Sequence, residues 1–146
     1  MLKLLSGLLA LPVLLILSVL MIFCGSEDYA RVINLNWELD LPTSEGCLYE
    51  TDSGASFGGD GERYHVLEYS SDSQLQETLE QAATPISPAE EAVTVILDGL
   101  SVPADQRPDY ADCCWFTAFR PEDARDKLYL LANSAGTRLF VIESFF

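Results

Sequence analysis

The sequence is poor in positive charge. Of its 146 residues, eight are Lys or Arg and one is His, against 23 Asp and Glu, which gives a formal net charge of −15. Such an acidic surface repels nucleic acid and the headgroups of anionic lipids. We therefore expect no nucleic-acid partner. The charge suits a cationic protein partner or Ca²⁺, although a well-solvated acidic surface requires neither.

The sequence also lacks the motifs of common enzymes and cofactor sites. It contains no G-x-S-x-G nucleophile elbow, no P-loop, no dinucleotide-binding fingerprint and no C-x-x-C pair. The absence of C-x-x-C argues against a thioredoxin-like site and against a zinc knuckle. We therefore predict a chain that binds no cofactor and no metal, and a protein that is not an enzyme.

Cysteines are few. Beyond Cys24, the chain contains Cys47, Cys113 and Cys114, and these three cannot all pair with one another. In an oxidising compartment, we expect a possible disulfide between Cys47 and either Cys113 or Cys114. Adjacent strand residues point to opposite faces, so one of Cys113 and Cys114 is expected to be a small buried apolar residue. A redox pair formed by these two neighbours is the alternative.

One long apolar run stands against this acidic remainder. Residues Leu4 to Cys24 carry no charge, and 21 helical residues span roughly 30 Å, the hydrocarbon thickness of a bilayer. Lys3 precedes the run, and Glu27 and Asp28 follow it, which places the carboxy-terminal part on the extracytoplasmic side. We predict a signal-anchor transmembrane segment at residues 1–26 and an extracytoplasmic domain at residues 27–146.

Two alternatives to a retained anchor stay open. Cleavage after Cys24-Gly25-Ser26 would release a secreted protein, although the apolar run is longer than the roughly 7–15 residues of a typical cleaved signal. Lipidation of Cys24 would give a lipoprotein, but Phe23 is bulky at a position that favours a small residue. Both contexts are poor, and they favour retention of the segment.

The pattern after the anchor predicts an α+β domain. Alternating polar and apolar residues predict a strand over 34–41, and further strands are expected over 47–51, 63–69, 112–119, 127–132 and 138–146. The last two form the clearest hairpin. With two helices between the third and fourth strands, we expect an antiparallel sheet of about six strands with both helices on one face.

The two helices have start signals of their own. Ser73 begins the first, and Leu75 and Leu79 form its apolar stripe. Ser87 is the expected N-cap of the second, with Pro88 at the first helical position. The second helix is expected to end near Gly99.

The segment Asp52–Gly61, DSGASFGGDG, is the most unusual stretch. Its glycines permit close backbone approach, so exposed amides there could bind an anion. Alternatively, Asp52, Asp60 and Glu62 could supply oxygen ligands to Ca²⁺, although Arg63 stands where an EF-hand has its bidentate Glu. The simplest interpretation is a loop stabilised by an Asx turn, with Phe57 packed into the core.

At this segment, with its D-S-G-x-x-F-G-G-D-G-x-x-Y pattern, the sequence resembles uncharacterised small bacterial membrane-anchored proteins. These have one amino-terminal hydrophobic segment and a D-x-G-x-F-G-D-G-like motif followed by an aromatic strand. The resemblance implies location and size but no activity. Gly58-Gly59 stand where such proteins often have Phe-His-Gly-Asp-Gly, so the histidine of that motif is missing here.

His65 is the only histidine. It could act as a general base if Asp52 or Asp60 folded over it, but a single strand histidine is more often a packing residue. We predict a membrane-anchored binding or interaction module whose ligand-binding residues are Asp52, Phe57, Asp60, Glu62 and His65. One alternative is a small metal-dependent or hydrolytic enzyme that uses the Asp52–Gly61 loop and His65. The other is an immunity-like protein whose acidic surface neutralises a basic partner.

Overall fold

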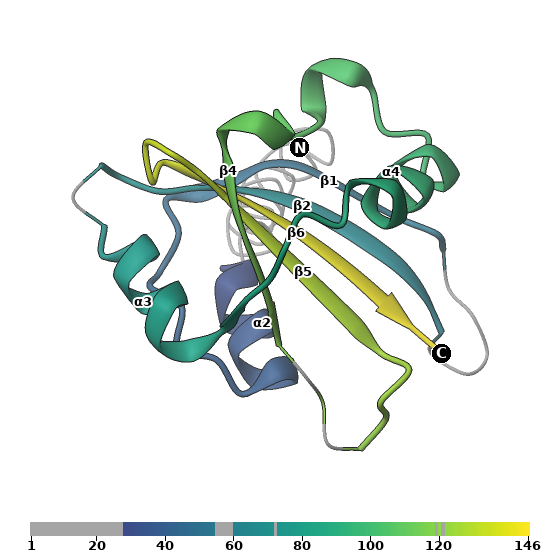
Figure 1. Cartoon of the computed structure of the whole chain (residues 1–146), viewed down its shortest axis with the longest axis horizontal. Helices are drawn as coiled ribbons and strands as arrows, with labels where there is room; N and C mark the ends of the chain where they lie inside the picture. The colour runs from purple at the N-terminus through teal and green to yellow at the C-terminus, as the bar shows by residue number, and fades with distance from the viewer. Residues whose placement is uncertain (1–27, 55–59, 72, 119, 121) are drawn as a thin grey trace, which may run out of the picture.

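The computed structural model describes residues 28–54, 60–71, 73–118, 120 and 122–146. Its centre is a six-stranded, fully antiparallel sheet in the order β1-β2-β6-β5-β4-β3 (Figure 1). The predicted α+β class with an antiparallel sheet of six strands is therefore confirmed for this part of the chain. The strands are β1 (Gly46–Asp52), β2 (Gly61–Glu68), β3 (Thr84–Pro85), β4 (Cys113–Ala118), β5 (Lys127–Asn133) and β6 (Arg138–Phe145).

In the part of the chain that the structure describes, three α-helices cover this sheet: α2 (Tyr29–Trp37), α3 (Leu75–Ala82) and α4 (Glu90–Gly99). The short 3-10 helices Ala104–Gln106 and Tyr110–Asp112 connect α4 to β4. The prediction that the helices share one face is wrong. Ile33 of α2 and Leu75 of α3 belong to one core cluster, while Leu97 of α4 belongs to a second. Figure 1 shows α2 and α3 on one side of the sheet and α4 on the other.

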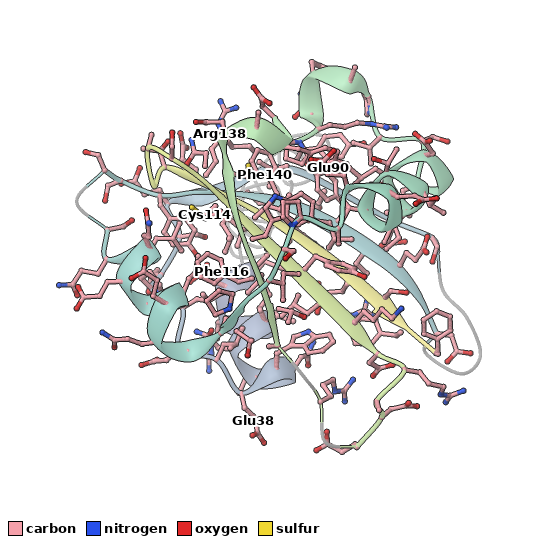
Figure 2. The ribbon with its side chains drawn as sticks, viewed as in Figure 1. Glu38, Glu90, Cys114, Phe116, Arg138 and Phe140 are labelled. Atoms are coloured by element: carbon pink, nitrogen blue, oxygen red, sulfur yellow. The ribbon has the colours of Figure 1, made fainter. Side chains whose placement is uncertain are left out.

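The central strands explain why both faces need a cover. In β6, Val141 packs in the core cluster with α2 and α3, whereas Ile142 packs in the cluster with α4. Both side chains are fully buried. A strand that is apolar on both faces requires helices on both faces. Glu38, which follows α2, and Glu90, which begins α4, accordingly lie on opposite sides of the sheet (Figure 2).

The prediction of a strand over 34–41 is wrong for the first half of that segment, where the chain forms α2. Asp28 caps this helix by accepting a hydrogen bond from the Ala30 amide, and Glu38 ends it in a left-handed conformation with φ 54°. The buried residues Ala30, Ile33 and Trp37 follow helical spacing. Leu35, which the alternating pattern placed in the core, is instead 74% exposed.

One of the six strands, β3, was not predicted from the sequence. It has two residues, and Thr84 pairs with Thr117 of β4 at the edge of the sheet. The other five predicted strands are present at nearly the predicted positions, including the β5–β6 hairpin. In its turn, the Asn133 side chain accepts hydrogen bonds from the amides of Thr137 and Arg138, each at 2.9 Å.

Both predicted helices in the middle of the chain are present, but their starts differ. The first helix begins at Leu75 rather than Ser73, and Leu75 and Leu79 are buried as expected. The second begins at Glu90, with Ala89 rather than Ser87 in the cap position. Its end at Gly99 confirms the predicted stop.

The predicted membrane segment, Leu4–Cys24, lies outside the described residues. Within residues 28–54, 60–71, 73–118, 120 and 122–146, no helix has the length and apolar character needed to cross a membrane.

Candidate functional site

The stem of the Asp52–Gly61 loop is closed by local hydrogen bonds. The Asp52 carboxylate accepts a bond from the Gly54 amide at 2.7 Å, which makes an Asx turn. Ser53 and Glu62 exchange further bonds, from the Ser53 amide to the Glu62 carbonyl and from the Glu62 amide to the Ser53 hydroxyl, each at 2.9 Å. The Asx turn expected from the sequence is therefore present. Phe57 lies outside the described residues.

His65 is packed in the core rather than presented to a ligand. It is 7% exposed, and its ring stacks on Tyr29 with centroids 3.3 Å apart and planes tilted by 14°. Burial, reinforced by the nearby positive charge of Arg63, lowers the pKa of His65 to about 4. At neutral pH the imidazole is therefore uncharged. Because the ring is uncharged, the 3.8 Å distance between Nε2 of His65 and Oε2 of Glu50 does not represent an ion pair.

The predicted ligand-binding residues that the structure describes do not form one site. Side chains alternate along β2, so Glu62 lies on the face covered by α4, while His65 lies on the face covered by α2. Asp52 is exposed and pairs in register with Arg63, and Asp60 is also exposed. Among the described residues, no group of three or more His, Cys, Asp or Glu side chains is arranged to hold a metal ion.

The structure does not form the predicted disulfide. Cys47, Cys113 and Cys114 are free thiols. Cys47 is in β1 and the other two are in β4, with β2, β6 and β5 between them. Four strand spacings of about 4.8 Å separate these strands by roughly 19 Å, whereas a disulfide needs Cα atoms within about 7 Å of each other.

A buried carboxyl group that the sequence analysis missed lies on the α2 face. Glu143 is fully buried in β6. Its carboxyl oxygens accept hydrogen bonds from the Tyr29 hydroxyl at 2.5 Å and from the Trp37 indole at 2.6 Å. Burial, together with the adjacent Glu143, raises the pKa of the Tyr29 hydroxyl, which keeps it a donor. The only sequence signal is one acidic residue within the apolar run of β6.

Aromatic rings and arginines extend this cluster to the surface. Arg63 stands opposite Glu143 in the β2–β6 pairing, and its guanidinium lies 4.8 Å from the centre of the Phe145 ring. Arg120 lies 5.7 Å from the same ring and 5.8 Å from that of Trp37. It also bonds to Asp126 at 3.0 Å. Trp37 of α2 also packs against Phe145 of β6, with ring centroids 5.8 Å apart, so the cluster fixes α2 against the sheet.

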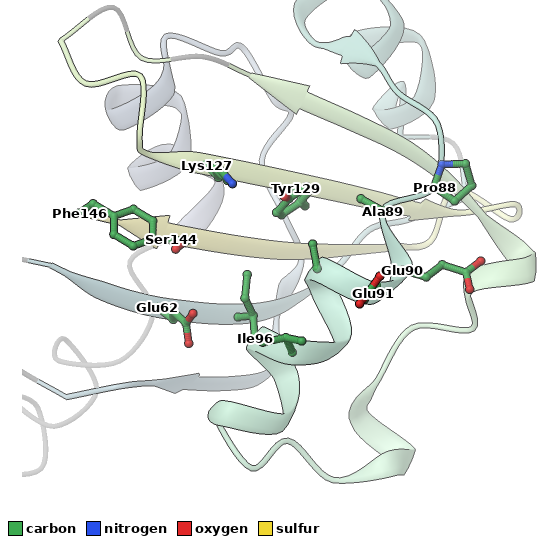
Figure 3. Close-up of a pocket in the computed structure, with 12 residues that line it drawn as sticks. Glu62, Pro88, Ala89, Glu90, Glu91, Ile96, Lys127, Tyr129, Ser144 and Phe146 are labelled. Atoms are coloured by element: carbon green, nitrogen blue, oxygen red, sulfur yellow. The ribbon is translucent and has the colours of Figure 1, made fainter.

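The other face of the sheet contains an open groove of about 630 Å³ beside α4 (Figure 3). Its floor is the end of the sheet, where Glu62 of β2, Ser144 of β6 and Lys127 of β5 lie in one cross-strand row. Its wall is α4 and the segment before it. We call this feature the α4 groove.

Apolar side chains in the α4 groove are exposed to solvent. Val95 on its wall is 66% exposed, and Phe146 at its end is 57% exposed. They are two of the four large apolar side chains that are exposed in the described part of the chain. Ile96, which is buried, and Tyr129, which is half-buried, also line the groove. Exposed apolar side chains in a concave region make this groove a candidate binding surface.

Acidic side chains stand at the two ends of α4 along this groove. Glu90 and Glu91 form the first turn of the helix. Glu62 lies at its other end, since Oε2 of Glu62 is 3.6 Å from the position that a Cβ on Gly99 would take. Figure 3 shows Glu62 beside Ile96 and apart from Glu90. Of the described residues that line the groove, Lys127 is the one that is basic.

The chain was compared with protein-family models, with curated protein sequences and with solved structures, and nothing matches it. The site must therefore be interpreted from its own geometry.

Proposed function

We propose that this chain is a small membrane-anchored binding module, without enzymatic activity, which presents the α4 groove to a basic protein on the extracytoplasmic side of the membrane. The observation that supports a binding role for the groove most directly is the position of Val95 and Phe146. Both are exposed, and both line one groove of about 630 Å³. Exposed apolar area of this kind is stabilised when a partner covers it.

The charge of the chain determines the kind of partner. Three carboxylates and one lysine line the groove, and the whole chain carries −15. The long-range field attracts a cationic partner and raises its rate of association, while it repels acidic proteins and nucleic acid. An immunity-like protein that neutralises a basic target would use the same surface.

A non-enzymatic role agrees with the chemistry of the described residues. His65 is the only histidine, and it is stacked on Tyr29 with its pKa lowered to about 4. Asp52 is engaged in the turn that it stabilises. The hydrolytic or metal-dependent alternative would require these groups to converge around a substrate, and Glu62 and His65 project from opposite faces of the sheet.

The position of α2 supports presentation of the groove away from the membrane. Only residues 25–28 separate Cys24, the end of the proposed anchor, from the first residue of α2. The five Cα–Cα steps from Cys24 to Tyr29 reach about 18 Å at most, which holds the start of α2 close to the bilayer. Because α2 and α4 lie on opposite faces of the sheet, the groove would then face outward.

The experiment uses the full chain in nanodiscs of phosphatidylcholine, a lipid whose headgroup carries no net charge. Fluorescence anisotropy of a labelled ten-residue lysine peptide measures binding, and a ten-residue glutamate peptide is the control. We expect saturable binding of the lysine peptide only, weakening as NaCl is raised from 20 to about 200 mM because screening shortens the reach of the charges. Equal affinity for both peptides, or binding of neither, would contradict the proposal.

Membrane location requires its own test. In intact cells, an external protease should digest the acidic domain, and the mature chain should retain the mass of the uncleaved sequence. A domain that is protected until the cells are lysed would overturn the predicted topology. A mature chain shorter by about 25 residues would support the secreted alternative.

A further inference from the structure

The arrangement of charge and apolar surface along the α4 groove is specific enough to suggest which segment of a partner would fit. Carboxylates stand at both ends of α4, with Glu90 and Glu91 at the start and Glu62 beside Gly99 at the end. Val95 and Ile96 lie on α4 between these ends and contribute apolar wall. The order along the groove is therefore acidic, apolar, acidic.

The spacing of these features can be estimated from the helix. Glu90 and Gly99 are the first and last residues of α4, so nine helical rises of about 1.5 Å separate them by roughly 13 Å. In an extended peptide, residues four apart are also separated by roughly 13 Å, at about 3.3 Å per residue. Because side chains alternate, residues i, i+2 and i+4 of such a peptide point to the same side.

We infer that the α4 groove selects an extended segment of a basic protein in which Lys or Arg at positions i and i+4 flanks an apolar residue at i+2. One basic side chain pairs with Glu90 and Glu91, and the other pairs with Glu62. The apolar residue at i+2 covers Val95, which is now exposed. This inference rests on the proposed function, since it names the sequence that the same groove recognises.

Lys127 adds to the selectivity for lysine or arginine at positions i and i+4. It stands in the same cross-strand row as Glu62, with Ser144 between them. Two strand spacings separate Glu62 from Lys127 by about 10 Å. A basic side chain that strays from Glu62 toward β5 therefore meets a like charge. Such repulsion disfavours segments whose second basic residue lies at another spacing.

The test compares peptides of one composition and different order, with the full chain in phosphatidylcholine nanodiscs at low salt. The matched peptide is acetyl-GKSLSKG-amide, with lysines at i and i+4 and leucine at i+2. The shuffled peptide, acetyl-GKKLSSG-amide, has the same composition and charge. We expect the matched peptide to bind about fivefold more tightly, because it forms one additional peripheral ion pair.

Variants of the chain identify the contacts. Glu62→Gln should remove the preference for the matched peptide, because the second lysine then has no anionic partner. Val95→Ser should lower the affinity for the matched peptide by about three- to tenfold, because the apolar contact with the leucine of the peptide is lost. Val95 is 66% exposed, so this change should leave thermal stability unaltered, which a melting curve checks.

The outcomes separate the inference from the proposal on which it rests. Equal affinity for the matched and shuffled peptides, with binding of both, would overturn the inference and leave a general preference for basic partners. A preference that persists unchanged in Glu62→Gln would also overturn it. Failure of the chain to bind either peptide or the ten-residue lysine peptide would overturn the proposed function itself.

Discussion

The indole N–H of Trp37 donates a 2.6 Å hydrogen bond to Oε1 of Glu143, a fully buried residue 106 positions further along the chain. The other oxygen of Glu143 accepts a bond from the hydroxyl of Tyr29, at the opposite end of α2. One carboxyl group in β6 therefore holds both ends of the first described helix. Because the buried Trp37 indole and the partly buried Tyr29 hydroxyl both depend on this one group, its removal leaves both donors without that acceptor.

Glu143→Leu should therefore be strongly destabilising. We expect the free energy of unfolding to fall by about 2 to 4 kcal/mol, because a buried indole N–H and a partly buried hydroxyl lose their acceptor. Urea unfolding followed by tryptophan fluorescence measures it, since both tryptophans, Trp37 and Trp115, lie in the described domain. Glu68→Leu, at an exposed position of β2, is the control and should change the free energy by less than about 0.5 kcal/mol. Similar values for the two variants would contradict the role given to Glu143.

His65 should make the domain less stable as the pH falls. Its folded-state pKa of about 4 is below the ordinary value of 6.5, so the unfolded chain binds the proton more readily. Its unfavourable contribution is absent above pH 6.5 and grows as the pH falls from 6.5 to 4. Between pH 7 and pH 5 this amounts to about 2 kcal/mol.

The variant His65→Phe keeps an aromatic ring against Tyr29 and removes the titration. Wild type should lose about 2 kcal/mol more stability than this variant between pH 7 and pH 5, measured by urea unfolding at each pH. Carboxylates titrate in both proteins and cancel in the comparison. Parallel losses in the two proteins would show that His65 is not buried as an uncharged ring.

Gly61 should not tolerate a side chain. Its φ of +141° is strained for other residues, and a Cβ there would lie 2.5 Å from the Ser53 hydroxyl. Gly61→Ala should cost about 1 to 3 kcal/mol of unfolding free energy. Gly46→Ala, in the paired strand, meets nothing within 4 Å and is the matched control. If the two alanine variants melt at the same temperature, the loop stem is not closed as described.

The three thiols of the described domain should differ in reactivity. Cys47 and Cys114 are exposed, whereas Cys113 is half-buried and its pKa is raised to about 12 by burial and by the charges of Asp112 and Asp109. Because the thiolate is the reactive form, Cys113 should react with maleimide at pH 8 at least tenfold more slowly than Cys114. Mass mapping of partly labelled protein gives the rates. Labelling of Cys113 at the rate of Cys114 would contradict this order.

Local sequence patterns predicted most of the sheet. The β5–β6 hairpin has apolar strands around a turn that Asn133 stabilises, and these signals lie within a few residues of one another. The apolar stripe and end of α4 are equally local. The prediction of a strand over 34–41 was wrong for a local reason. Trp37, Leu39 and Leu41 are buried at alternating positions and so imitate a strand, while the helical stripe begins upstream at Ala30.

The features that depend on tertiary structure could not be predicted from the sequence. Nothing in the run that contains Glu143 indicates that its partners are Tyr29 and Trp37. The continuous apolar run of β6 does predict a strand buried on both faces, but which helix covers which face appears only in the tertiary structure. The α4 groove likewise joins Glu62, Val95 and Phe146 from three distant parts of the chain.

The measurement that tests the central claim most directly compares two double variants of equal charge. Glu90→Gln with Glu91→Gln removes two carboxylates at the groove, and Glu77→Gln with Glu80→Gln removes two from exposed positions of α3, on the other face of the sheet. Binding of the ten-residue lysine peptide should weaken by about three- to tenfold in the first variant and by less than twofold in the second. Equal weakening in the two variants would show that the acidic surface attracts the peptide without a specific site, and would contradict a binding role for the α4 groove.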